Sequence, residues 1–169
     1  VLSVDRNGQL HPVSSPSLPE SYSARFEGVS IGPRTGSCGT AAFLGTPVIV
    51  TDIEGDPLWD GYRHLALPLG LKACWSSPII NGDGRVIGTF AFYYGEKRGP
   101  GELEKEVVAT CTHLCTIAFE RHERVLVREK LAFSDALTGL WNRARFDLTL
   151  HNASEIAGVH GLLLVDIDN

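Results

Sequence analysis

No methionine occurs in this chain of 169 residues, and no apolar run reaches the length that a membrane-spanning helix needs. The chain opens on Val1-Leu2-Ser3-Val4, a strand-like run that lacks the basic-then-apolar order of a signal segment. We therefore expect a fragment whose preceding segment is missing, with no membrane anchor in this part. The net charge of −5 offers no basic surface for non-specific binding to nucleic acid.

Cysteine is present four times, without the paired spacing of a zinc site. Cys111 and Cys115 are four residues apart, on one stripe of a predicted helix, so we expect them to be small apolar residues of a core. A reducing, cytoplasmic setting fits this cysteine usage best. The six histidines share no ligand spacing, and we predict no metal centre from them.

The composition that remains is that of an ordinary globular chain, with 43% hydrophobic and 21% charged residues. Its length allows one domain and part of a second. Two hairpins are predicted by tight-turn sequences, Asp5-Arg6-Asn7-Gly8 and Asn81-Gly82-Asp83-Gly84, each between two extended runs. The second hairpin joins Leu71–Ile80 to Arg85–Tyr94. Val86–Tyr94 is apolar on both faces and is therefore predicted to be a central strand.

Short helices are predicted between these strands. Apolar residues four apart predict one within 15–26, and Ser37–Leu44 offers an N-cap serine and ends at Gly45. Pro47–Thr51 predicts a β-branched strand. We expect the long connection Asp52–Gly70 to contain one short helix.

The longest predicted element is a helix over Gly101–Ser134, with acidic residues in its first turn and a polar second half. Its length, about 50 Å, exceeds what one small domain covers, so we expect its second half to act as a connector. Two apolar stripes run along it. They contain Leu103, Val107, Cys111, Leu114, Ala118 and Val125, and Val108, Cys115, Phe119 and Leu126. The whole order predicts an α+β fold, an antiparallel sheet of five to six strands flanked by helices.

Residues 1–122 resemble a GAF domain, the small-molecule-sensing module of signalling proteins. The segments that carry the resemblance are Gly36–Ala42, Pro47–Ile53, Asp56–Trp59, Cys74–Ile79 and Gly88–Phe90. The helix that precedes the first strand in this family is expected to be missing. Helices at the two ends of the domain often build the family's dimer interface, so the resemblance implies a homodimer.

The GAF resemblance implies a ligand cavity near Ser37–Ala42 and the Asp52–Gly70 connection. Its candidate lining residues are Cys38, Trp59, Tyr62, Cys74, Trp75, Ser76 and Tyr93. Aromatic side chains with a few polar groups are typical of ligand sites, and equally of a core whose tryptophan N–H groups are satisfied. A cyclic nucleotide is one ligand class that the family admits, whereas no Cys/His arrangement of its tetrapyrrole-binding members is present.

Residues 135–169 resemble the opening of a GGDEF domain, the catalytic fold of diguanylate cyclases. The signature is Asp135-x-Leu137-Thr138-Gly139-Leu140-x-Asn142-Arg143, followed by a predicted strand, Gly161–Asp168. By this resemblance Asp166 and the backbone carbonyl of Ile167 would hold Mg²⁺ for GTP in the full-length protein. The rest of that site lies beyond Asn169, so we expect no cyclase activity from this chain itself.

The leading hypothesis is a cytoplasmic bacterial sensor: a GAF domain (1–122) and a helical linker (123–134) that regulate a diguanylate cyclase beginning at 135. The full-length enzyme would convert two GTP to cyclic di-GMP. One alternative is a redox enzyme, because Cys38 resembles the cysteine of GAF-fold free methionine sulfoxide reductases and Cys74 would resolve it. A helix N-terminus lowers a thiol's pKa, and Cys38 is near one. The other alternative is a ligand-free dimerisation module.

Overall fold

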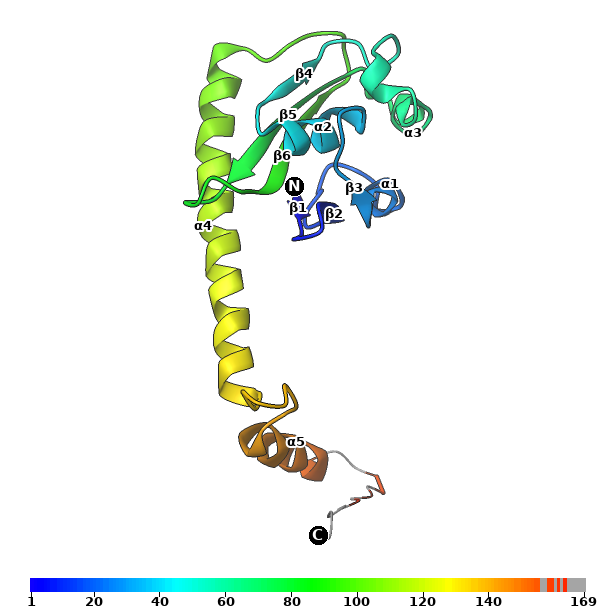
Figure 1. Ribbon diagram of the computed structural model, residues 1–169. Coiled ribbons are helices and arrows are strands. Elements are labelled where there is room, and N and C mark those ends of the chain that lie inside the picture. Colours follow the sequence, from blue (N-terminus) through cyan, green and yellow to red (C-terminus); the bar gives the residue numbers. More distant parts are fainter. Residues whose placement is uncertain (156–157, 160, 162, 164–169) are drawn as a thin grey trace. The chain divides into compact units, whose positions relative to one another are not determined.

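A computed structural model describes residues 1–155, 158, 159, 161 and 163 of the chain (Figure 1). These divide into two compact units, Val1–Glu120 and Arg121–Asn169, and each is described by itself. Asp166 and Ile167 lie outside the described residues. The predicted strand Gly161–Asp168 lies mostly outside them, so the structure does not test it.

The first unit is built on one antiparallel sheet of six strands, in the order β3-β2-β1-β6-β5-β4. The strands are β1 (Leu2–Val4), β2 (Gln9–Pro12), β3 (Val29–Ser30), β4 (Val48–Val50), β5 (Ala73–Ile80) and β6 (Val86–Tyr94). The α+β prediction is therefore confirmed, as is the central place of β6, which pairs with β1 on one side and β5 on the other.

Both predicted hairpins form, and short polar side chains hold their turns. The Asp5 carboxylate accepts hydrogen bonds from the backbone N–H groups of Asn7 and Gln9, at 2.9 and 2.7 Å. In the second hairpin the Asn81 side-chain oxygen accepts from the N–H groups of Asp83 and Arg85. Such side-chain contacts to the backbone two to four residues on explain why these residues favour turns.

Five α-helices and three single-turn 3₁₀ helices are assigned within the described residues. The α-helices are α1 (Glu20–Ser23), α2 (Gly36–Leu44), α3 (Arg63–Ala66), α4 (Glu102–Phe133) and α5 (Arg143–Glu155). The 3₁₀ helices are Ala24–Phe26, Pro57–Trp59 and Leu67–Leu69.

The connection from Asp52 to Gly70 contains three short helical pieces, so the prediction of one helix there is wrong. Asp56 caps the first piece by accepting a hydrogen bond from the Leu58 N–H at 2.9 Å. Pro57 and Pro68 stand near the starts of the first and third pieces, where their missing N–H groups cost nothing. Pro68 is the second residue after α3 and favours a new helical start over a longer helix.

A second correction concerns α2. Gly45 ends this helix in a left-handed conformation, as predicted, but its N-cap is Thr35 and not Ser37. The Thr35 N–H donates to the hydroxyl of Thr40 at 3.3 Å, and Ser37 lies fully buried in the first turn. Ser37 is thus free to serve a contact elsewhere in the core.

Two separate apolar layers cover the two faces of the sheet. The larger layer joins α1, α2 and the 57–66 region to one face, around Trp59, Leu10 and Phe26. The smaller layer lies on the other face, where Trp75 and Tyr94 pack with Val108 of α4. Alternating residues of β5 and β6 serve the two layers in turn, as the two-residue period of a strand requires.

Helix α4 confirms the predicted long helix, with bounds one residue inside those expected. Its start is held by Glu104, which accepts from the Gly101 N–H at 2.6 Å and pairs with Arg98 at 2.5 Å. The Thr116 hydroxyl donates to the Ile80 carbonyl, and the Gly82 N–H donates to Glu120. These contacts fix the helix against the β5–β6 hairpin.

The two apolar stripes of α4 differ in their surroundings within the first unit. Val108 is 3% exposed and faces the sheet, whereas Leu103 and Leu114 are 74% and 59% exposed. Val107 and Ile117 extend this exposed stripe.

In the second unit a tight turn comes directly after α4. One oxygen of Asp135 accepts from the Leu137 N–H, the Thr138 N–H and the Thr138 hydroxyl. Gly139 has φ +72°, a conformation that glycine adopts without strain. Asn142 donates to the Ala132 carbonyl at 2.9 Å and accepts from the Arg145 N–H, which caps α5.

Candidate functional site: a cavity beside a buried thiol pair

A cavity of about 690 Å³ lies on the larger apolar layer of the first unit. Pairing of β1 with β6 covers Gly88 and Thr89, and the next residues of β6, Phe90–Tyr93, line the cavity. Its other walls are the 14–18 segment, α1 with Phe26, and Cys38 of α2. The walls are mainly apolar and aromatic, with serine hydroxyls along one side, which is typical of small-molecule sites.

Two of the seven predicted pocket residues line this cavity, Cys38 and Tyr93. Trp59 and Cys74 belong to the same apolar layer, with Tyr62 packed against it, but they lie outside the lining. Ser76 of β5 is fully buried, and its hydroxyl helps to lower the pKa of Cys38.

Trp75 is placed elsewhere, on the opposite face of the sheet with Tyr94 and Val108. Neighbouring strand residues point to opposite faces, so Cys74 and Ser76 take the cavity side and Trp75 cannot. Its predicted place in the pocket is thereby corrected.

Several lining residues had not been singled out from the sequence, among them Leu18, Tyr22, Phe26, Leu71 and Phe90. The Ser14-Ser15-Pro16-Ser17 run is a local signal for a loop that could have marked this wall. Nothing local indicated that it would lie beside β6.

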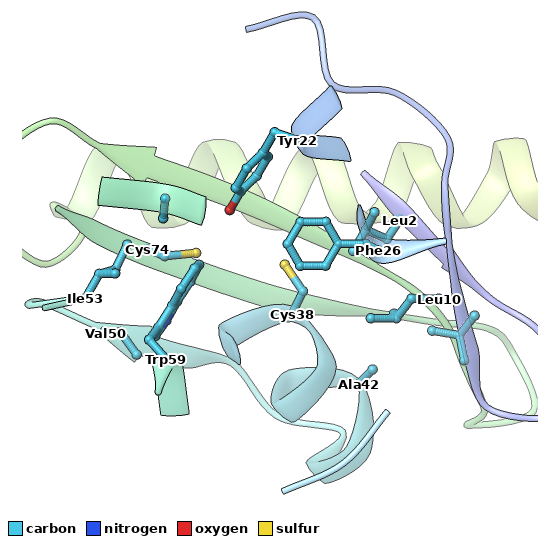
Figure 2. Close-up of a cluster of buried hydrophobic side chains, with 12 residues drawn as sticks. Leu2, Leu10, Tyr22, Phe26, Cys38, Ala42, Val50, Ile53, Trp59 and Cys74 are labelled. Atoms are coloured by element: carbon cyan, nitrogen blue, oxygen red, sulfur yellow. The ribbon is translucent and has the colours of Figure 1, made fainter. Parts of the chain in front are cut away.

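Trp59 has a structural role. It lies in the buried cluster of Figure 2 and is 1% exposed. Its indole N–H donates to the hydroxyl of Ser37 at 3.0 Å. The buried donor is therefore satisfied inside the core, and the ring packs edge-on against Tyr93. Trp59 supports the cavity wall from behind.

Two tyrosine hydroxyls meet at the cavity. Tyr22 of α1 donates to Tyr93 of β6 at 3.2 Å. Burial raises the pKa of both phenols, so both stay neutral at physiological pH and can donate or accept hydrogen bonds.

The thiols of Cys38 and Cys74 lie between α2 and the sheet (Figure 2). A hydrogen bond from Cys74 lowers the pKa of Cys38 to about 6, against the opposing effect of burial. Burial and the neighbouring Cys38 raise the pKa of Cys74. The pair therefore favours one thiolate, on Cys38, and one thiol, on Cys74.

Within the described residues, no group of three or more histidine, cysteine, aspartate or glutamate side chains is arranged to hold a metal ion. Nor does any helix of the described part have the length and apolar character to cross a membrane.

This sheet, with a cavity on one face and a long helix on the other, is the architecture of a sensory domain. The family model of the GAF domain matches residues 1–120, and the chain belongs to that family.

Among curated proteins, the chain is similar to the methyl sulfide methyltransferase-associated sensor of Methanosarcina acetivorans, with 42% identity over 105 residues. The match covers 62% of this chain and 10% of that protein, so the chain spans about a tenth of its relative.

Among solved structures, a domain assigned to a two-component sensor histidine kinase protein of Sinorhizobium meliloti 1021 is similar, with a TM-score of 0.60 at 19% identity. That alignment covers 76% of this chain and 82% of the other. The reduced form of fRMsr of Staphylococcus aureus aligns with a TM-score of 0.47 and 19% identity, over 68% of this chain and 66% of that one.

Proposed function

We propose that the first unit senses a small molecule bound in the cavity and, through α4, regulates a diguanylate cyclase module in cyclic di-GMP signalling. The observation that carries the sensing part is the cavity itself. Its volume of about 690 Å³ suits a small organic ligand, and its walls combine aromatic rings with hydroxyls and one thiol. Membership of the GAF family and likeness to a sensor support this reading.

A route from the cavity to α4 runs through β6. Ala91 and Tyr93 line the cavity on one face of this strand, while Phe90 and Phe92 also pack in the layer that contains Val108 of α4. A ligand that moves β6 changes the surface on which α4 rests. Because α4 continues to Phe133, such a change can reach the residues beyond the end of this helix.

The cyclase part of the proposal rests on the 135–143 signature. Two of its residues have a structural role. Asp135 holds the turn, and Asn142 bonds to the end of α4 and caps α5. A firmly bonded turn is suited to pass a shift of α4 onward. In the full-length protein Asp166 and the Ile167 carbonyl would bind Mg²⁺ and GTP, and the present chain would be non-catalytic.

A cytoplasmic homodimer completes the proposal. All four cysteines, which are among the described residues, are free thiols, as a reducing compartment allows. The exposed stripe of Leu103, Val107, Leu114 and Ile117 offers an apolar surface for a second copy. The same stripe would serve the competing hypothesis, a dimerisation module without a ligand.

Filling the cavity should abolish ligand retention without unfolding the chain. We expect protein purified from its source organism to carry a small molecule in native mass spectrometry. Ala91→Leu adds volume to the cavity wall and should weaken that binding about tenfold or more. Ala109→Leu, the same change on an exposed face of α4, is the matched control and should bind normally. Ligand-free protein from the native source would instead favour the dimerisation module.

Regulation is tested in the full-length protein by measuring cyclic di-GMP formed from GTP and Mg²⁺. We expect turnover to change when the molecule released from the native protein is added, and Ala91→Leu to remove that response while keeping the basal rate. The 169-residue chain alone should form none. A full-length protein that forms no cyclic di-GMP would contradict the cyclase part and leave the cavity test standing.

A second candidate function is the reduction of free methionine sulfoxide, favoured by the adjacent Cys38 and Cys74 thiols. Incubation with methionine sulfoxide and a dithiol reductant should then release methionine, and Cys38→Ser should stop it. Absence of turnover in the wild-type chain would rule this function out.

A further inference from the structure

Two cysteines, Cys38 and Cys74, are buried together in the first unit, and ligand sensing gives no reason for this arrangement. The two thiols come from different elements, α2 and β5, and lie in one buried cluster between α2 and the sheet (Figure 2). Cys38 also belongs to the cavity wall with 6% of its surface exposed, whereas Cys74 is fully buried. A small reagent can therefore reach Cys38 through the cavity, whereas Cys74 is outside the cavity lining.

Two hydroxyls on the sheet add an independent observation. Ser76 Oγ and Thr89 Oγ1 are fully buried and have no partner of ordinary hydrogen-bond geometry among the described atoms. Both hydroxyls favour the charged form of Cys38 and so lower the pKa of that thiol. An unpartnered buried hydroxyl is costly, so ionisation of Cys38 would give each a charge-assisted bond.

From this juxtaposition we propose that Cys38 and Cys74 form a hydroperoxide-responsive dithiol, which closes to a disulfide in the wall of the cavity. The inference concerns thiol chemistry alone, and it holds whether or not the cavity binds a ligand or a cyclase lies further along the chain.

The chemistry balances with a hydroperoxide as oxidant. The Cys38 thiolate attacks the terminal oxygen of the peroxide, the O–O bond breaks, and Cys38 becomes a sulfenic acid while the hydroxide or alkoxide takes a proton. Cys74 sulfur then attacks the Cys38 sulfur. The S–O bond breaks, an S–S bond forms, and the departing hydroxide takes the Cys74 proton as water. Two thiols have lost two electrons and the peroxide has gained them.

The groups around Cys38 favour its charged form, whereas its burial opposes that form. The Cys74 thiol lowers the pKa of Cys38 most, and the Ser76 hydroxyl, the Val1 ammonium and the Thr89 hydroxyl lower it further. The phenols of Tyr22 and Tyr93 come from α1 and β6 and remain neutral, because burial raises the pKa of each and the two cysteine sulfurs raise it further. The thiolate is thus surrounded by donors and neutral groups.

The test uses a Cys111→Ser/Cys115→Ser background of the full chain, so that only the pair can react. We expect one equivalent of hydrogen peroxide to remove both thiols, with an intact mass lower by two hydrogens and a Cys38–Cys74 peptide after digestion. Cys74→Ser should stop at a sulfenic acid that a dimedone-type reagent labels, and Cys38→Ser should leave Cys74 unreacted. Peptide mapping of oxidised wild-type protein gives the same answer if a variant does not fold.

A pH profile separates an activated thiol from an ordinary one. With a pKa of about 6, roughly a quarter of Cys38 is thiolate at pH 5.5, against about one part in a thousand for an ordinary cysteine. A less basic thiolate is a weaker nucleophile, which reduces the rate roughly tenfold and offsets part of this advantage. Cys38 should therefore react about 20-fold faster than a model thiol at that pH. Thr89→Val should move the midpoint of the profile upward while keeping the fold.

The proposal fails if peroxide leaves both thiols intact, if wild-type oxidation occurs at Cys111 and Cys115 instead, or if the sulfenic acid of Cys38 never closes on Cys74. A parallel incubation with free methionine sulfoxide distinguishes the oxidants. A disulfide formed by the sulfoxide and not by peroxide would overturn this inference and support the methionine sulfoxide reductase function.

Discussion

Gly88→Ala should destabilise the first unit by about 3 kcal/mol, although it adds a single methyl group. A Cβ at this position would lie 2.5 Å from the Leu2 carbonyl oxygen, 2.7 Å from the Phe119 ring and 3.3 Å from Ile79. The first contact is with backbone of the paired strand β1, which cannot move without breaking the β1–β6 register. The usual gain from replacing a strand glycine, about 0.5–1 kcal/mol, is too small to compensate.

Equilibrium urea denaturation measures this loss, and Gly61→Ala is its matched control. A Cβ at Gly61 would meet no atom within 4 Å, and its φ is not in the left-handed region. We expect that control to stay within about 0.5 kcal/mol of the wild type. Equal stability of the two variants would mean that β1, β6 and α4 do not meet at Gly88.

A double variant separates the two clashes at Gly88. Phe119→Leu shortens the side chain that α4 presents to β6, and it should recover part of the loss in the Gly88→Ala background. The contact with the Leu2 carbonyl remains, so recovery should be incomplete. A coupling of about 1 kcal/mol between the two positions is expected for residues in direct contact.

Trp59→Ala should cost about 4 kcal/mol, which is most of the stability of a marginal domain. Trp59 is the largest fully buried side chain, and its removal leaves a void between α2 and the sheet. It also leaves the buried hydroxyl of Ser37 without the indole donor that it now accepts from at 3.0 Å. Loss of cooperative unfolding, followed by circular dichroism, is the expected result.

The hydrogen bond can be measured apart from the volume. Trp59→Phe keeps much of the ring and should cost about 2 kcal/mol, and Ser37→Ala should cost about 1–3 kcal/mol because the indole N–H then lacks an acceptor. The double variant should cost less than the sum. Trp141→Phe, at a side chain 66% exposed in the second unit, should change stability by about 0.5 kcal/mol or less.

The local features of the fold were predictable because residues close in the chain decide them. The Asn7-Gly8 and Asn81–Gly84 turns, the glycine at the end of α2 and the periodicity of α4 each act within a few residues. The sequence also marked Cys38 and Tyr93 as pocket residues, through the resemblance of the surrounding segments. Ser37 was misjudged as a cap because its hydroxyl is a good local acceptor, and a tryptophan 22 residues away uses it instead.

By itself, then, the sequence determined the hairpins, the long helix, the α+β class and the family to which residues 1–120 belong. Only the tertiary structure decided that Trp75 packs on the α4 side of the sheet while Cys74 packs on the side of Cys38. It also decided that the 14–18 segment lines a cavity, and that the hydroxyls of Ser76 and Thr89 act on the Cys38 thiol. The physical reason is that a turn or a helical stripe is set by near neighbours. The face a strand residue takes, and the distant segment it meets, depend on strand order and register, which no short stretch of sequence encodes.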